Sequence, residues 1–230
     1  MAALAETAAR ERRTLAQQQA ERKRTLDRIG ADLGRQRAEV SRLQADEARL
    51  ARLVEQIARA LRSAPPPTRR EAVKPPPRTE APKSARNEPV PQAGMPDLAF
   101  ASLKGRLHLP VRGELRGRFG TPRTGQPGGG KGVFIAAREG EEVRAVASGR
   151  VVFADWMRGF GNLLILDHGD DYLTIYGNNE AVLKRLGDAV HGGEAVATVG
   201  SSGGAETSGL YFEIRHQGRA FDPLPWVSSR

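Results

Sequence analysis

Residues 3–62 contain no proline, and the regular spacing of their apolar residues constrains the fold more than any other feature of the chain. Eleven positions follow one another at alternating intervals of three and four, and nine of them are apolar: Leu26, Ile29, Leu33, Gln36, Val40, Leu43, Glu47, Leu50, Val54, Ile57 and Leu61. This spacing is typical of a coiled-coil seam. Because a lone helix cannot bury its own stripe, the pattern predicts a partner: a second helix, another copy of the chain or a different protein.

The rest of the chain divides into a linker and a compact domain. Residues 63–97 hold ten of the fifteen prolines and predict an extended linker. Residues 98–230 carry short β-branched runs separated by glycine-rich turns, with one short helix expected over residues 179–188. The predicted fold is therefore an α-helical coiled-coil segment over residues 1–62, followed after the linker by a mainly β domain over residues 98–230.

The net charge of +9 is concentrated in the first two segments. Residues 1–97 contain 20 Lys and Arg against 13 Asp and Glu, a net +7, whereas residues 98–230 contain 16 against 14, a net +2. We interpret the excess as a solvated helix face, and nucleic acid is not an expected partner; anionic lipid and an acidic protein surface stay open. The chain has no cysteine, which excludes disulfides and thiolate metal sites.

No apolar run is long enough to span a membrane, and the first residues lack the hydrophobic region of a signal peptide. The chain as written is expected to be soluble. A start downstream of an export signal also stays open.

The motifs "RFG", "GKGVFIAA", "ASGRVVFA", "GFGNLLILDHGDDYLTIYGNN" and "LYFEIRHQGRAFDPLPW" occur in an order that resembles a LytM domain. The resemblance implies the fold of the lysostaphin-like zinc endopeptidases, with antiparallel sheets that form a groove. Active members carry histidines and an aspartate that hold zinc and move protons. The matching positions here are Gly130, Phe134, Asn178, Gly209 and Tyr211. The resemblance therefore implies no catalytic residue, metal or cofactor; an endopeptidase with an unusual metal site is the weakest alternative.

The remaining candidate ligands do not rebuild a site. His108, His168, His191 and His216 have no mutual spacing of two or four, and are expected in turns or on the surface. Asp167, Asp170 and Asp171 lack the spacing of a calcium loop and are interpreted as a polar turn.

The motifs "KGV", "ADW", "YGNN", "GSSGG", "LYFEIR" and "PLPW" resemble the EnvC-type activators of peptidoglycan amidases. This resemblance implies a non-catalytic periplasmic protein of cell separation, whose groove binds an N-acetylmuramoyl-L-alanine amidase and displaces its autoinhibitory helix. It also implies control of the coiled coil by the FtsE/FtsX divisome transporter, with peptidoglycan nearby. An envelope or divisome scaffold that binds peptidoglycan is the alternative.

The expected partner-binding groove combines aromatic or apolar residues with positive charge at its edge. Its members are Lys131, Val133, Phe134, Trp156, Phe160, Tyr211 and Arg215. Trp156 and Phe160 are expected to form an aromatic wall, and Val133 and Tyr211 to flank the groove. Members of the family have a two-helix arm and a further helix that covers the groove, and the sequence shows no clear counterpart of that covering helix.

Overall fold

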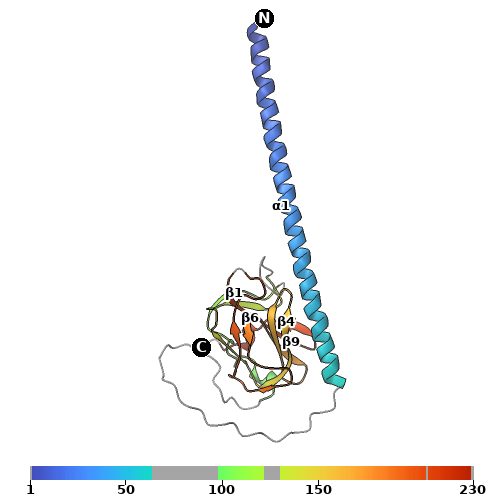
Figure 1. Ribbon diagram of the computed structural model, residues 1–230, viewed down its shortest axis with the longest axis vertical. Helices are drawn as coiled ribbons and strands as arrows, with labels where there is room; N and C mark the ends of the chain where they lie inside the picture. Colours follow the sequence, from blue (N-terminus) through green and yellow to red (C-terminus); the bar gives the residue numbers. More distant parts are fainter. Residues whose placement is uncertain (1, 64–97, 122–129, 206, 229–230) are drawn as a thin grey trace. The chain divides into compact units, whose positions relative to one another are not determined.

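The computed structural model describes residues 2–63, 98–121, 130–205 and 207–228, with side chains from Arg10 onward (Figure 1). It divides into two compact units, residues 1–42 and residues 43–230. The predicted linker lies almost entirely outside the described residues.

Helix α1 (Ala2–Ser63) confirms the predicted N-terminal helix. Its residues up to Arg42 form the first unit, and the apolar seam residues there are exposed. The last 21 residues of α1, from Leu43 to Ser63, belong to the second unit together with the β domain. No helix among the described residues is both long enough and apolar enough to cross a membrane.

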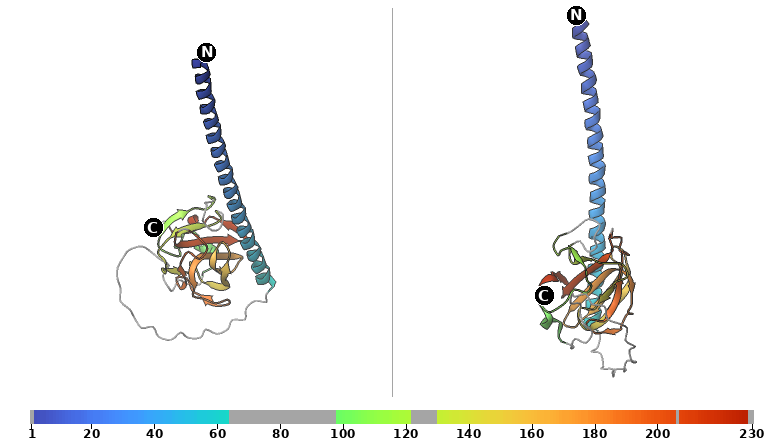
Figure 2. Two further views of the ribbon diagram at one scale, coloured as in Figure 1. Left: turned by 45° about the horizontal axis from the view of Figure 1, so that its top comes forward. Right: turned by 90° about the vertical axis from the view of Figure 1, so that its left-hand side faces the viewer.

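The β domain is one antiparallel sheet of ten strands (Figure 2). Its main path runs β1-β2-β9-β6-β5-β4-β7, with β10 paired to β9 and β8 paired to both β3 and β6. The strands are β1 (Glu114–Gly117), β2 (Val133–Ala136), β3 (Glu142–Arg144), β4 (Gly149–Met157), β5 (Gly161–Asp167), β6 (Tyr172–Val182), β7 (Ala189–Val190), β8 (Ala195–Val199), β9 (Gly209–His216) and β10 (Arg219–Phe221). Two short 3₁₀ helices, Phe100–Leu103 and Leu224–Trp226, lie at the ends of the domain sequence.

Both faces of the central strands are buried. In β9, Leu210, Phe212 and Ile214 belong to one buried cluster, and Tyr211 belongs to another. Successive side chains of a strand point to opposite faces, so the two clusters lie on opposite sides of the sheet. This explains why the central strands are nearly continuous apolar runs instead of alternating ones.

The second cluster includes residues of α1, and we call it the helix-side cluster. Its buried members are Leu50, Val54, Phe134, Met157, Phe160, Leu163, Ile165, Leu173, Ile175 and Tyr211. Leu50 and Val54 of α1 are fully buried on this side of the sheet. The C-terminal part of the predicted seam therefore packs on the β domain of its own chain.

The predicted hairpins are confirmed, and the predicted short helix is wrong. The β5–β6 turn contains Asp170 and Asp171 with positive φ, and the β9–β10 turn contains Gln217 and Gly218 with positive φ. Residues 179–182 extend β6 because they pair with β8, and residues 183–188 form turns.

Candidate functional site

Four of the five positions that the resemblance to LytM domains assigns to zinc ligands or proton carriers lie together on the helix-side face. Phe134 of β2 pairs in register with Tyr211 of β9, and Ala136 pairs with Gly209. Asn178 of β6 donates from Nδ2 to the carbonyl oxygen of Gly209 over 2.8 Å. The fifth position, Gly130, lies in the turn before β2, and its carbonyl accepts a hydrogen bond from Gly120 N over 2.7 Å.

Aromatic rings fill the space that ligand side chains would occupy. Phe134 and Tyr211 are each only 2% exposed. A Cβ atom at Gly209 would lie 2.6 Å from Cζ of Phe134 and 2.6 Å from the carbonyl oxygen of Ile135. A Cβ atom at Gly132 would lie 2.8 Å from the Tyr211 ring. The glycines thus make room for the two rings, and no side chain fits at position 209 beside Phe134.

Asn178 is fully buried, and its hydrogen bonds connect separate segments of the β domain. Its Nδ2 donates to the carbonyl oxygens of Gly200 and Gly209, and its Oδ1 accepts from Gly203 N over 2.9 Å. Its backbone N–H donates to Phe160 O over 2.6 Å, and its φ of 66° lies in the left-handed region that asparagine tolerates better than most residues. The side-chain amide therefore joins β6 to the loop of residues 200–203 and to the start of β9, and the backbone N–H adds a bond to Phe160.

These residues do not fit a zinc ion. Glycine and phenylalanine side chains offer no donor, and the Asn178 amide is already bonded on both atoms. The Tyr211 hydroxyl donates to Glu213 Oε2 over 2.5 Å. Among the described residues, no group of three or more His, Cys, Asp or Glu side chains is placed to hold a metal ion.

A buried polar network lies beside the rings on β9. Glu213 is fully buried and accepts hydrogen bonds from Tyr211 Oη and from Arg215 Nε. Burial raises the pKa of Glu213, and it raises the pKa of Tyr211 well above its ordinary value, with the Glu213 charge acting in the same direction. Arg215 is 2% exposed, and its Nη2 has no hydrogen-bond partner among the described residues. A buried donor without a partner is costly.

The C-terminal part of α1 is held on this face by apolar contacts and by charges at both ends. Leu50 and Val54 fill the centre, and Glu47 forms an ion pair with Lys131. Asp46 is buried against Gly159, where a Cβ atom would lie 2.7 Å from its Oδ2. Gly159 therefore leaves room for the helix in addition to adopting a positive φ.

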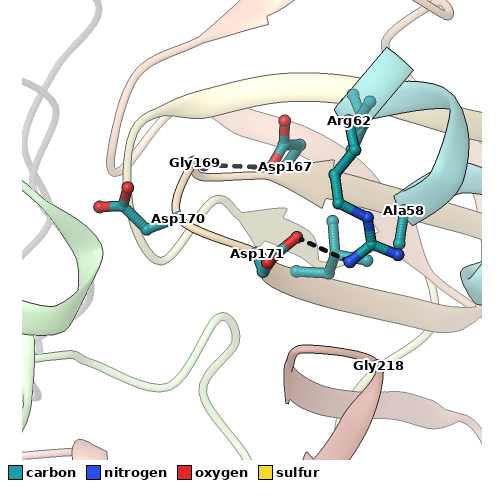
Figure 3. A pocket seen from close by; sticks show the side chains of 9 residues that line it. Ala58, Arg62, Asp167, Gly169, Asp170, Asp171 and Gly218 are labelled. Carbon is teal, nitrogen blue, oxygen red and sulfur yellow. Dashed lines mark hydrogen bonds and ion pairs between the residues drawn. The ribbon is translucent and has the colours of Figure 1, made fainter. Parts of the chain in front are cut away.

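The far end of the helix contacts the β5–β6 turn. Arg62 Nη1 lies 3.6 Å from Asp171 Oδ1, as Figure 3 shows. A pocket of about 310 Å³ lies between them and is lined by Ala58, Leu61, Arg62, Asp167, Gly169, Asp170, Asp171, Leu173 and Gly218. Burial raises the pKa of Asp167, and the neighbouring Asp171 charge raises it further.

The structure corrects several sequence-based expectations about the groove. Val133 belongs to the cluster on the opposite face and does not flank Tyr211. Phe160 is fully buried and packs on Tyr211 with ring centroids 5.4 Å apart, whereas Trp156 is 58% exposed and belongs to neither buried cluster. Phe160 and Trp156 therefore do not form one aromatic wall. Arg215 lies inside the fold instead of at an edge.

The residues of α1 that lie on this face were not predicted as part of the site. Asp46, Glu47, Leu50 and Val54 were attributed to a coiled coil, because the same spacing serves a helix that packs on a sheet. The sequence contained one indication of this contact. Glu47 is an acidic residue inside an apolar stripe, and it forms an ion pair with Lys131 of the β domain.

His168 lies in the predicted β5–β6 turn, but its ring packs into the fold instead of facing the solvent. His168 is partly buried, with Nδ1 2.7 Å from Ser148 O and Nε2 2.7 Å from Thr174 Oγ1. Its ring stacks on Phe100 with centroids 4.6 Å apart. Burial lowers the pKa of His168 to about 4, and the hydrogen bond to Ser148 opposes this only in part. His168 is therefore neutral and structural at neutral pH.

Proteins with similar sequences agree with the resemblance of the β domain to LytM domains. The sequence model described as peptidase family M23 matches residues 128–223. The murein hydrolase activator EnvC of Escherichia coli K12 is 36% identical over 215 residues, which cover 90% of this chain and 50% of that protein. The murein hydrolase activator NlpD of the same strain is 41% identical over 122 residues, covering 53% of this chain and 31% of that protein.

Among solved structures, the catalytic domain of lysostaphin from Staphylococcus simulans is 28% identical, with a TM-score of 0.46, and the match covers 49% of this chain and 90% of that domain. The chain thus spans half or less of the length of the two activators it matches. The match to peptidase family M23 extends over residues 128–223, and the chain is similar in sequence to murein hydrolase activators.

Proposed function

We propose that the chain is a non-catalytic activator of a peptidoglycan amidase, and that the amidase binds the helix-side face of the β domain. The observation that carries this proposal is that the Phe134 and Tyr211 rings, at positions that the LytM resemblance assigns to zinc ligands, are packed on a face that already receives an apolar helix. Aromatic residues packed with apolar neighbours are typical of the energetic centre of a protein interface. The names of the similar E. coli proteins, murein hydrolase activators, support the same role.

The partner is an N-acetylmuramoyl-L-alanine amidase, which supplies the zinc and the hydrolytic chemistry. Binding shifts the amidase toward the state in which its own inhibitory helix has left the active site. This requires that the activator bind the open amidase more tightly than the closed one. Arg215, with its unsatisfied Nη2, and Lys131 are the cationic groups on this face that an acceptor of the amidase would meet.

In this account, residues 43–63 of α1 compete with the amidase for the same face. Leu50 and Val54 are buried there, so the face is open only when the helix leaves. Each buried side chain of this kind contributes on the order of 2 kcal/mol to the closed state. Control of α1 by the FtsE/FtsX transporter, in the periplasm and close to peptidoglycan, fits such a competition and is part of the proposal.

Release of dye from labelled peptidoglycan sacculi tests the function. The purified chain, the amidase of the source organism and their mixture are compared in the presence of zinc. The proposal predicts little release by either protein alone, more release by the mixture, and the most release when the chain in the mixture carries Leu50→Glu and Val54→Glu. Release by the chain alone would contradict the non-catalytic role. Retention on sacculi without any effect on the amidase would favour the scaffold alternative.

A further inference from the structure

The part of α1 that lies on the β domain is held more tightly at one end than at the other. Its residues at intervals of four are buried over three turns: Asp46, Leu50, Val54 and Ala58. Arg62 is the next residue at this interval, and 58% of its side chain is exposed. The packing of the helix on the β domain therefore weakens over its last turn, although the helix itself continues to Ser63.

The Asp46 end of this segment is closely packed. A Cβ atom at Gly159 would lie 2.7 Å from Oδ2 of Asp46, so the carboxylate lies directly against the turn between β4 and β5. Arg158 of the same turn has its Nε 4.0 Å from Oδ1 of Asp46. Glu47 adds its ion pair with Lys131, in which the glutamate side chain is only 19% exposed. Separating this end from the β domain breaks both charge contacts.

The Ser63 end covers a cavity instead of a packed surface. The cavity has a volume of about 310 Å³, and its helix wall consists of Ala58, Leu61 and Arg62 (Figure 3). Side chains that border a cavity lack neighbours on that side and lose dispersion contacts. Arg62 reaches across to Asp171 over 3.6 Å, but the two side chains are 58% and 34% exposed. Exposed ion pairs of this kind contribute little to stability.

We propose that this segment of α1 leaves the β domain in two steps, and that the Ser63 end opens first. In the intermediate, residues 57–63 are detached, while Asp46, Leu50 and Val54 keep their places. Proteins open locally where few buried apolar contacts hold an element. The first step uncovers Leu173, which lines the cavity, and leaves the centre of the helix-side cluster closed.

The order of opening is a property of the chain alone, and only its consequence rests on the proposed function. A partner that competes with α1 meets the cavity end of the face first and displaces the tighter end from there. A test without any amidase therefore separates the two proposals. Its failure leaves activation intact, and a failure of activation leaves the order of opening intact.

Thiol labelling of single cysteines measures the opening of each part, since the chain has no cysteine of its own. Val54→Cys and Ala58→Cys place a thiol at buried helix positions on either side of the proposed break. Each rate of reaction with iodoacetamide is divided by the rate of the same variant unfolded in urea. The expected ratio is at least tenfold higher for Ala58→Cys. Equal ratios, or a higher ratio for Val54→Cys, would overturn the proposal.

Glu47→Gln distinguishes two steps from one. The change removes the ion pair with Lys131, which breaks only when the segment leaves completely. Labelling of Val54→Cys should therefore become about two- to fivefold faster, and labelling of Ala58→Cys should not change. Glu55→Gln is the matched control, because Glu55 pairs with Arg59 of the same helix, and it should change neither rate. An equal acceleration at both cysteines by Glu47→Gln would show one concerted step and overturn the proposal.

Discussion

The ring of Phe134 occupies the space that any side chain at Gly209 would need. A Cβ atom added at Gly209 would lie 2.6 Å from Phe134 Cζ, although Gly209 pairs with Ala136 and Phe134 pairs with Tyr211. This part of the helix-side face is a packed interior, in which glycine at position 209 leaves the space that the ring of Phe134 fills.

Gly209→Ala should therefore lower the free energy of unfolding by about 1–3 kcal/mol, as overpacking of a core does. In the background of Phe134→Leu, where the ring is gone, the same change should cost less. Chemical denaturation of the single and double variants measures this coupling. Gly34→Ala is the control, because a Cβ atom there meets open space on a helix and should not destabilise the chain. Equal costs in both backgrounds would show that the ring is not the obstacle.

Leu50→Glu combined with Val54→Glu should release residues 43–63 from the β domain. Two carboxylates cannot be buried against Phe160 and Tyr211 without a large cost. Hydrogen exchange of the backbone amides of α1 and of β9 should become faster in the variant. Gln56→Glu introduces the same side chain at an exposed position of the same helix segment and should leave the exchange unchanged. Unchanged exchange in the double variant would mean that the helix does not depend on these contacts.

Glu47→Lys should weaken the closed state more modestly. The change replaces the ion pair with Lys131 by a repulsion between two partly exposed cations, an effect of about 1 kcal/mol or less. Amidase activation should rise by about two- to fivefold at low salt, and the rise should shrink as salt screens the charges. Lys131 itself belongs to the proposed amidase contact, so the substitution is made on the helix. A decrease in activation would indicate that Glu47 contacts the amidase directly.

Acid should destabilise the β domain through His168. Because the folded-state pKa is about 4 and the ordinary value is 6.5, the unfolded chain binds the proton more readily, and stability falls as the pH drops through this interval. The loss amounts to about 3 kcal/mol. The raised pKa values of Asp167 and Glu213 act in the opposite direction, so the contribution of His168 is taken from the difference between variants.

His168→Asn keeps a donor for Ser148 O and has no imidazole to protonate. Its free energy of unfolding, measured by urea titration at several pH values, should depend less on pH than that of the unmodified chain. His191→Asn removes an exposed histidine and should follow the unmodified chain. Parallel pH profiles for the chain and for His168→Asn would contradict the account of this residue.

The strands and their turns could be predicted because glycines and β-branched runs mark them locally. The end of β6 could not be predicted, because residues 179–182 become a strand only by pairing with β8. The seam of α1 predicted a helix, but its C-terminal part packs on the β domain instead of in a coiled coil, because spacing alone does not distinguish a helix partner from a sheet. Arg215 was expected at an edge, but β9 is a central strand that pairs with β2, β6 and β10 and is buried on both faces.

Whether the amidase and α1 compete for one face is the central claim, and a binding titration tests it most directly. The amidase is titrated calorimetrically into the unmodified chain and into the Leu50→Glu, Val54→Glu variant, with Gln56→Glu as the control. The account predicts weak binding to the unmodified chain and to the control, and at least tenfold tighter binding to the variant. Equal affinity for all three, or weaker binding to the variant with released α1, would contradict it.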